Sequence, residues 1–405
     1  MKPIVRAGRM KPVHSDIRGP LFVEAMKRQK QGIDILKLNT GNPATFGFGL
    51  PDSIKNALME HMQDGVGYCD FKGMPQARQA ICDYETSKGI KGITPDDVFI
   101  GNGVSEVVSF ALTPLLNDGD EVLVPSPSYS LWGNSVYLED GKPVFYTCDE
   151  QANWYPDIQD IRSKITDKTK AIVIINPNNP TGVLYPKELL LEIIQIARES
   201  GLLIFADEIY DRLVMDGKQH ISLASLTEDV PVITLNGLSK SHCLCGYRCG
   251  WMVISGPREL TEDYRQGIIQ LTSLRLCANT MAQIVIPAAL DDMETPAPMV
   301  RPGGRIYEQR EATVRELEKI DGLSFVKNDA AFYVFPKLDV KKFNITNDKQ
   351  FAHDLLDVTN ILLVPGSGFD WKDPDHFRIV MLPQADILSD AIRRMGTFLD
   401  GYKQK

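Results

Sequence analysis

Residues 171–182 read AIVIINPNNPTG and residues 202–211 read LLIFADEIYD, and these two stretches decide the fold. Each begins with a short, almost wholly apolar run and ends in polar residues. Between them, residues 187–200 carry the amphipathic pattern of a helix. Two strands that are apolar on both faces, joined by a helix, are typical of a parallel sheet covered by helices on both sides.

Similar apolar runs flank this unit. Together they predict seven strands, at residues 98–100, 121–124, 143–146, 171–175, 202–206, 232–235 and 250–254. Helical patterns intervene at residues 106–116, 131–138, 157–164 and 187–200. The sequence therefore predicts an α/β fold whose large domain has a mostly parallel seven-stranded sheet between helices.

The pattern of strands and helices changes after about residue 295. Helices are expected at residues 306–320, 350–359 and 385–402, with strands at 324–326, 331–335, 361–364 and 377–380. This less regular order favours a smaller α+β domain. We expect residues 1–45 to form an N-terminal arm and part of the small domain, residues 46–295 the large domain, and residues 296–405 the small C-terminal domain.

Composition excludes several classes of protein. The chain has 405 residues, of which 43% are hydrophobic and 24% charged, a balance typical of a globular protein. The net charge of −9 and the lack of a basic tract argue against nucleic-acid binding. The apolar runs are far shorter than the ~20 residues of a membrane span, so no membrane association is expected. The first 20 residues have no apolar core of a secretory signal.

Cysteine and histidine spacing gives two further expectations. The seven cysteines show no disulfide framework, which favours free thiols and a cytoplasmic location. The six histidines show no metal-ligand spacing, so no metal is expected.

Polar residues follow four of the predicted strands, where ligands bind in open α/β sheets. The turn Gly101–Gly103 and Ser105 begin a helix and could hold an anion, although a plain tight turn with a serine cap explains them as well. The string Asn176–Gly182 forms a rigid turn that holds Asn178 and Asn179 at the sheet edge.

Two charged residues stand at the ends of the next strands. Asp207 follows a fully apolar run, and such a carboxylate needs a cation, either a neighbouring Lys or Arg or a ligand nitrogen. Lys240 follows residues 232–235, and lysine forms Schiff bases when a nearby cation lowers its pKa. Arg248 offers a planar fork for phosphate. Glu208 and Asp211 are expected to be surface charges or helix caps.

An anion cradle, neutral donors, a buried carboxylate and a buried lysine together fit pyridoxal phosphate. The phosphate of this cofactor suits a helix N-terminus and an arginine, its aldehyde suits a lysine, and its pyridinium nitrogen suits a carboxylate.

The same segments resemble the class I pyridoxal-phosphate aminotransferases of fold type I. The resemblance rests on NPNNPTG at 176–182, ADEIY at 206–210, LSK at 238–240 and GYRCGW at 246–251, in order along nearly the whole chain. Further stretches are similar to the bacterial glutamate–pyruvate (alanine) aminotransferases. They are residues 16–20, 41–44, 67–70, 127–129, 275–279 and 376–379.

The resemblance implies a role for each matching residue. Lys240, Asp207 and Tyr210 would be catalytic: Lys240 would bond to the cofactor aldehyde and move the proton, Asp207 would pair with the ring nitrogen, and Tyr210 would bind the ring oxygen. The remaining cofactor contacts would come from Val104, Ser105, Tyr129, Asn179, Ser239, Arg248 and Tyr68. Tyr68 would reach the phosphate in the partner subunit, which implies a homodimer. Gly237 stands where many relatives have a phosphate-binding serine.

The resemblance also implies the substrate side. Arg378 would bind the α-carboxylate of an amino acid, with Gly41 and Asn179 beside it. Arg18 would bind a distal carboxylate or form part of a lid, or it is a surface residue that caps a helix. The implied reaction is ping-pong transamination between alanine and 2-oxoglutarate. Another aminotransferase (aspartate, aromatic or branched-chain) and a carbon–sulfur lyase of the same fold remain as alternatives. A cofactor-dependent transcription regulator is disfavoured by the acidic charge and by the lack of room for a DNA-binding domain.

Overall fold

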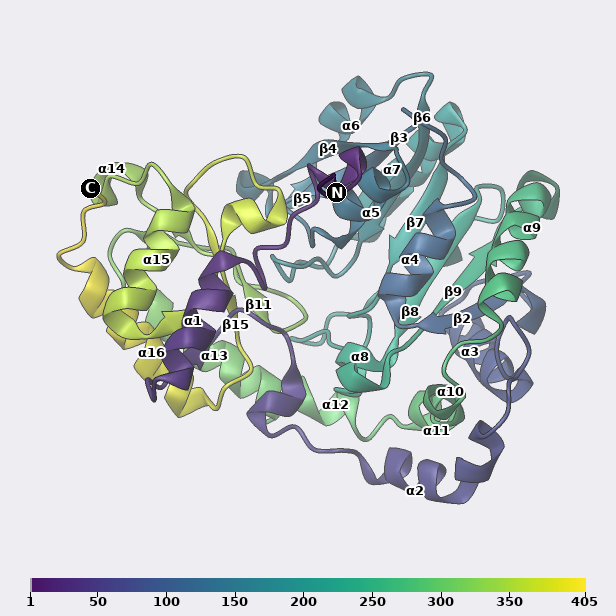
Figure 1. Cartoon of the computed structure of the whole chain (residues 1–405), viewed down its shortest axis with the longest axis horizontal. Coiled ribbons are helices and arrows are strands. Elements are labelled where there is room, and N and C mark those ends of the chain that lie inside the picture. Colours follow the sequence, from purple (N-terminus) through teal and green to yellow (C-terminus); the bar gives the residue numbers. More distant parts are fainter. Residues whose placement is uncertain (1) are drawn as a thin grey trace.

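The computed structural model describes residues 2–405 and has two bodies, a large one around a twisted sheet and a smaller one beside it (Figure 1). The sheet has eight strands in the order β2-β9-β8-β7-β6-β3-β4-β5. In chain order their bounds are β2 (Val98–Asn102), β3 (Glu121–Ser126), β4 (Lys142–Asp149), β5 (Tyr155–Pro156), β6 (Thr169–Ile175), β7 (Leu203–Asp207), β8 (Val232–Gly237) and β9 (Cys249–Ser255). The five adjacent strands β8, β7, β6, β3 and β4 are parallel, whereas β9 is antiparallel to both of its neighbours, β8 and β2.

The predicted α/β fold is confirmed, and each of the seven predicted strands lies in this sheet. The sheet has one strand more than expected, because the two residues of β5 pair antiparallel with the end of β4. The sequence does not predict β5, because a strand of two residues that contains a proline has no periodic pattern.

Helices cover both faces of the sheet because its strands are apolar on both faces. In β6, Ile172 and Ile174 belong to one core, whereas Val173 and Ile175 belong to the opposite one. This division follows from the alternation of side chains along a strand. The covering helices are α4 (Val104–Leu112), α5 (Leu131–Leu138), α6 (Ile158–Lys164), α7 (Lys187–Ser200) and α9 (Arg258–Arg275). A third core lies under α2 (Asp52–His61), α3 (Pro75–Ser87), α10 (Thr280–Ile284) and α11 (Ile286–Asp291).

The smaller body contains a three-stranded antiparallel sheet and two strand pairs. The sheet consists of β11 (Tyr333–Val334), β15 (Phe377–Val380) and β14 (Val364–Pro365); the pairs are β1 (Leu36–Lys37) with β13 (Ile361–Leu362) and β10 (Leu323–Ser324) with β12 (Lys337–Leu338). Its helices are α1 (Pro20–Lys30), α12 (Pro296–Met299), α13 (Arg305–Leu317), α14 (Val340–Phe343), α15 (Asp348–Thr359) and α16 (Ala385–Leu399).

The N-terminal arm contacts both bodies (Figure 1). The backbone of His14 exchanges hydrogen bonds with the Asn134 side chain on α5, at 3.1 and 2.6 Å. The imidazole of His14 lies 3.0 Å from the Asp370 carboxylate. Within residues 2–405, no single helix has both the length and the apolar composition to cross a membrane; α9 taken together with residues 280–291, at a bend of 118°, passes that test only as a pair.

Candidate active site

The ends of β7 and β8 bring two of the expected residues to the same sheet edge. Asp207 is the last residue of β7, and Lys240 lies in α8 (Leu238–Ser241), which follows β8 directly. Since β7 and β8 are adjacent and parallel, both residues leave the sheet on one side. Figure 1 places α8 at the boundary between the two bodies.

Lys240 has no acidic partner among residues 2–405. Its Nζ donates to the Gly41 carbonyl at 2.9 Å and lies 5.9 Å from the centroid of the Phe332 ring. Burial acts to lower the pKa of Lys240, but neighbouring groups, Tyr333 foremost, raise it, so the net pKa shift is upward. The sequence led us to expect a lowered pKa through a neighbouring cation. Arg378 does act in that direction, but its effect is the smaller one.

Asp207 is a buried carboxylate that lacks a cationic partner in the described part of the chain. Its Oδ2 accepts a hydrogen bond from Trp132 Nε1 at 3.1 Å, and Oδ1 accepts one from the Ile209 amide at 3.4 Å. Burial raises the pKa of Asp207 to about 6, and the bond from Trp132 acts in the opposite direction. The simpler expectation, an ion pair with a neighbouring Lys or Arg, is wrong.

Glu208 and Asp211 are not the surface charges that the sequence suggested. They are 1% and 9% exposed, and both contact the ammonium group of Lys88. Lys88 comes from the end of α3, far away in the sequence, so the local pattern held no sign of the pairing.

Tyr210 lies against the site from the turn after β7. Its hydroxyl is 2.9 Å from the hydroxyl of Tyr333, and the two buried rings meet edge to face at 5.6 Å. The Gly41 backbone approaches the same place so closely that a Cβ at Gly41 would overlap the Tyr333 hydroxyl.

Arg378 is a buried arginine without a carboxylate partner in residues 2–405. It is 1% exposed on β15, and its guanidinium donates to Asn179 Oδ1 at 2.9 Å and to the Asn39 carbonyl. It also lies 4.6 Å from the ring centroids of both Tyr333 and Phe369. Burial lowers its pKa, because the charge has no opposite charge beside it.

The N-terminus of α4 has the features of an anion cradle. The first amides of a helix, here those of Val104 and Ser105, have no carbonyl partner within the helix. Gly103 precedes them at φ 82°, and a Cβ there would collide with the Arg248 guanidinium. A Cβ at Gly250 would strike the Gly103 backbone, 2.6 Å away. Both glycines therefore let Arg248 and its strand pack against the start of this helix.

Several expected residues are more open. Tyr129 and Ser239 are half-buried, and Ser105, Arg248 and Arg18 are exposed. Tyr68 is 83% exposed. The carbonyl of Ile17, next to Arg18, accepts a hydrogen bond from the Asn39 side chain at 2.8 Å. The Asn39 carbonyl in turn accepts a hydrogen bond from Arg378.

Sequence reasoning missed four residues of this site: Trp132, Phe332, Tyr333 and Asn39. Phe332 and Tyr333 read as part of an apolar strand, and Trp132 as a helix core position. Only the proline and glycine turn at residues 41–43 marked the neighbourhood of Asn39.

The arrangement fits pyridoxal phosphate by the chemistry of its donors. Asp207 offers a buried negative charge that suits the ring nitrogen, Lys240 offers an amine for the aldehyde, and the α4 amides with Arg248 suit the phosphate. Within residues 2–405, Asp207 has no cationic partner and Lys240 has no acidic one. The ring nitrogen of a bound cofactor would supply the charge opposite Asp207, and its aldehyde would bond to Lys240.

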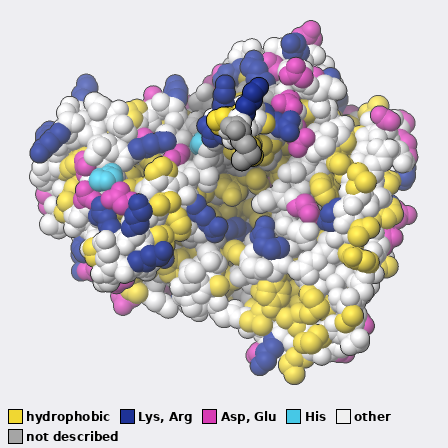
Figure 2. All heavy atoms as spheres, viewed as in Figure 1, with side chains coloured by type: hydrophobic (Ala, Val, Ile, Leu, Met, Phe, Trp, Pro, Cys, Tyr) yellow, Lys and Arg dark blue, Asp and Glu magenta, His cyan; other side chains and the backbone are white. Residues whose placement is uncertain are grey.

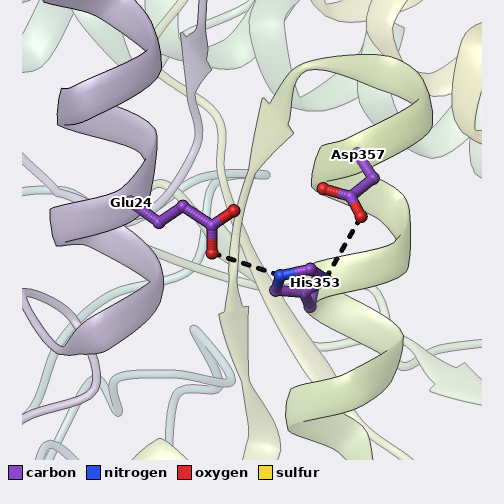
Figure 3. A group of neighbouring side chains, drawn as sticks. All are labelled: Glu24, His353 and Asp357. Atoms are coloured by element: carbon purple, nitrogen blue, oxygen red, sulfur yellow. Dashed lines mark ion pairs between the residues drawn. The ribbon is translucent and has the colours of Figure 1, made fainter.

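Glu24, His353 and Asp357 form another cluster of side chains that metal ions commonly bind. Figure 3 shows His353 of α15 between Glu24 of α1 and Asp357, at 3.1 and 3.3 Å. Arg28 binds the remaining oxygen of each carboxylate. The four side chains form a closed ring that ties α1 to α15, and the positive charge of Arg28 disfavours a metal ion at this place.

Comparisons with known proteins agree on one family. The model of the family "Aminotransferase class I and II" matches residues 33–392. The glutamate-pyruvate aminotransferase of Haemophilus influenzae is 50% identical, with all of both chains covered. The alanine aminotransferase of Mycobacterium bovis is 45% identical over all of this chain and 94% of its own. Among solved structures, the alanine aminotransferase of Pyrococcus furiosus is 41% identical with a TM-score of 0.93, covering 98% of this chain and 100% of its own.

Proposed function

The chain belongs to the class I and II aminotransferase family, and from that premise we propose that it exchanges the amino group between L-alanine and 2-oxoglutarate, giving pyruvate and glutamate. The cofactor of this family is pyridoxal phosphate. The names of the similar proteins from Haemophilus influenzae and Mycobacterium bovis support this choice of substrates.

One observation carries the proposal: two buried charged groups and a half-buried lysine meet, and none of them has an ion-pair partner within residues 2–405. They are Asp207, Lys240 and Arg378. Burying an unpaired charge is costly, and proteins keep such groups where a ligand supplies the partner. A pyridinium nitrogen matches Asp207 and a substrate carboxylate matches Arg378, whereas an aldehyde would bond to the amine of Lys240.

These positions support the following cofactor contacts, which are part of the proposal. Asp207 would bind the ring nitrogen, Asn179 and Tyr210 would bind the ring oxygen, and Tyr129 would stack on the ring. The phosphate would lie among four groups: the amides of Val104 and Ser105, Ser239 and Arg248. When bound, pyridoxal phosphate supplies an electron sink that withdraws electrons from the Cα of the amino acid.

The chain's own residues would do the remaining work. Arg378 would grip the α-carboxylate with its planar fork, assisted by Asn179 and by the Gly41 backbone. Lys240 Nζ would take the proton from Cα of the amino acid and deliver it to the carbon that was the aldehyde carbon of the cofactor. An ionised Asp207 would hold the ring nitrogen in its protonated form, which strengthens the withdrawal of electrons. Donor and acceptor would bind in turn at one place, which is a ping-pong mechanism.

The second carboxylate of 2-oxoglutarate calls for a second cation. We assign it to Arg18, which is exposed and forms no ion pair within residues 2–405. Its neighbour Ile17 is linked to Arg378 through Asn39. Closure of the arm would therefore bring Arg18 toward the substrate.

A homodimer is part of the proposal. Tyr68 is 83% exposed, far more than an isolated chain would favour for an aromatic ring, and it would reach the phosphate in the other subunit. Exposed apolar side chains lie close by in sequence, at Met59, Met62 and Val66. Figure 2 shows hydrophobic side chains gathered on this face around α2, α10 and α11. Such a patch is typical of a protein interface.

The proposal also includes a cellular location and a division into domains. We propose a cytoplasmic location, since all seven cysteines are free thiols, as is usual in a reducing compartment. We also propose the division into residues 1–45 with 296–405 and residues 46–295, supported by a separate core under α13, α15 and α16.

The test uses purified protein loaded with pyridoxal phosphate. L-Alanine alone should change the visible spectrum of the bound cofactor without releasing ammonia, and 2-oxoglutarate should restore it with formation of glutamate. Lys240→Ala should abolish both changes. A higher kcat/KM with aspartate, aromatic or branched-chain amino acids would assign another aminotransferase activity. Pyruvate and ammonia formed from L-cysteine without an oxo acid would instead assign a carbon–sulfur lyase.

A further inference from the structure

A second group of charges begins at Glu208, the residue after Asp207. It centres on Lys88, which follows the last residue of α3 and whose side chain is 13% exposed. Lys88 Nζ lies 2.7 Å from Glu85, 2.8 Å from Glu208 and 3.2 Å from Asp211. The three carboxylate side chains are at most 3% exposed, so a single ammonium group serves three buried acids.

Two of these acids flank site residues in the sequence. Glu208 follows Asp207, and Asp211 follows Tyr210. The Glu208 amide donates to the Leu235 carbonyl of β8 at 2.9 Å, and the Asp211 amide closes a turn on the Glu208 carbonyl at 3.0 Å. The side chains of Glu208 and Asp211 contact Lys88, whereas Asp207 and Tyr210, the residues that precede them, belong to the candidate active site.

The network also reaches the strand that leads to Lys240. Asn236, at the end of β8, donates to Asp211 Oδ2 at 2.7 Å and accepts from the Gly237 amide at 2.7 Å. Trp251 pairs with Asn236 across β8 and β9, and its Nε1 donates to Glu85 Oε1 at 3.2 Å. The contacts of Lys88 therefore extend to the ends of β7, β8 and β9.

We propose that Lys88 is a positioning residue for the transamination: its buried ammonium group fixes the turn 208–211 and the end of β8, and through them Asp207, Tyr210 and Lys240. The proposal rests on the proposed function above. Lys88 itself would touch neither cofactor nor substrate.

The other basic groups nearby cannot replace Lys88. Arg212 donates to the carbonyls of Ala289, Leu290 and Asp292, and lies over the Tyr84 ring. His220 lies 3.9 Å from Glu208, but burial lowers its pKa, so at neutral pH it is uncharged. Tyr84 donates to Asp211 at 2.5 Å and carries no positive charge.

Removing the ammonium group should disturb Asp207 in a defined direction. Burial is the main cause that raises the pKa of Asp207, and the charge of Glu208 adds to it. In Lys88→Met that charge loses its partner, so the pKa of Asp207 should rise further above about 6. Misplacement of the turn should also lower kcat by about tenfold or more. The KM for alanine should stay within about twofold, because Arg378 lies on a different strand.

Trp132 gives a direct readout of this change. Its indole N–H donates to Asp207 Oδ2, so its proton–nitrogen NMR signal should shift as Asp207 titrates. The chain has only four tryptophans. The variants Trp132→Phe and Trp251→Phe would identify the signals of the two indoles that donate to Asp207 and to Glu85. The measurement uses the full-length protein, both freed of pyridoxal phosphate and loaded with it, and needs no substrate.

Matched variants separate positioning from a purely structural role. Lys91→Met removes an exposed lysine, paired only with Glu228, from just beyond the same helix and should leave all readouts unchanged. Lys88→Arg keeps the charge and should retain most of kcat. Lys88→Met/Glu85→Gln removes one charge of each sign and leaves one buried acid fewer without a cation, so it replaces Lys88→Met if that variant does not fold. The pH midpoint of its Trp132 signal should still be raised. Glu208→Gln, which keeps Lys88, should lower that midpoint.

Failure of the positioning role and failure of the proposed function give different results. A folded Lys88→Met or double variant with a wild-type Trp132 midpoint and a wild-type kcat would overturn the positioning role. A wild-type protein that does not transaminate alanine would overturn the proposed function instead, and the Trp132 titration would still decide whether Lys88 acts on Asp207.

Discussion

Replacing Gly41 by alanine tests how tightly the substrate side of the site is built. A Cβ at Gly41 would overlap the Tyr333 hydroxyl and lie 3.0 Å from a ring carbon of Phe332. Both rings are at most 1% exposed, and Tyr333 is held by the Tyr210 hydroxyl and beneath the Arg378 guanidinium. The methyl group must therefore displace Tyr333 or the Gly41 backbone.

The size of the effect follows from the packing. Forcing a methyl group into a filled space costs about 1–3 kcal/mol. Since about 1.4 kcal/mol corresponds to a factor of ten, kcat/KM should fall by about 5- to 150-fold. Both ways of relieving the overlap damage the site, because Tyr333 supports Arg378 and the Gly41 carbonyl accepts from Lys240.

The assay follows pyruvate formation from L-alanine and 2-oxoglutarate, with cofactor content checked by absorbance. Gly49→Ala is the matched control, because a Cβ there has nothing within 4 Å. Tyr333→Phe removes the overlapping hydroxyl, so Gly41→Ala should cost less in that background than in the wild type. Equal losses in the two backgrounds, or a Gly41→Ala variant as active as Gly49→Ala, would refute the packing argument.

Three further predictions concern charged groups. The pKa of Asp207, raised by burial to about 6, means that it is ionised above that pH, so affinity for pyridoxal phosphate should be full at neutral pH and fall below pH 6. Fluorescence titration between pH 5 and 7 checks this, and Asp207→Asn should flatten the curve; a wild-type affinity that does not change would contradict it. Arg378→Lys should raise KM for both alanine and 2-oxoglutarate by about tenfold or more, since a lysine lacks the planar fork, and unchanged KM values would exclude the assignment. Hydrogen bonds to Asp16 and Asp370 raise the pKa of His14 from 6.5 to about 9, so the protonated ring stabilises the fold fully below pH 6.5 and this contribution is lost as pH rises toward 9. Urea unfolding across that range should show the decline, and His14→Asn should show less of it; identical slopes would count against the contact.

Most of the large body could be predicted because its strands carry a strong local signal. Runs such as 171–175 are apolar at every position, and α5 and α7 begin and end where their patterns do. The smaller body was harder. The expected strand 361–364 is divided into β13 and β14, which pair with different partners, β1 and β15. Pairing partners that lie far away in the sequence leave no trace in a local pattern.

The same reason limits what the sequence reveals of the site. Lys240 and Asp207 stand out because a charge at the end of an apolar strand is unusual. Glu208 and Asp211 look like surface charges, since Lys88, the lysine that pairs with them, is 120 and 123 residues away. Tyr333 looks like a core residue, and only its contacts with Tyr210 and Arg378 distinguish it.

The hydrogen bonds of Arg378 also bear on the order in which the protein is made. Its partners Asn179 and Asn39 lie 199 and 339 residues earlier in the chain. Every strand of the eight-stranded sheet leaves the ribosome before Arg378 is synthesised, since the sheet ends at Ser255. Domains generally fold as units during synthesis, the N-terminal part first. A nascent chain can therefore fold the strand ends that carry Asp207 and Lys240 before it contains Arg378, the residue that would bind the substrate carboxylate.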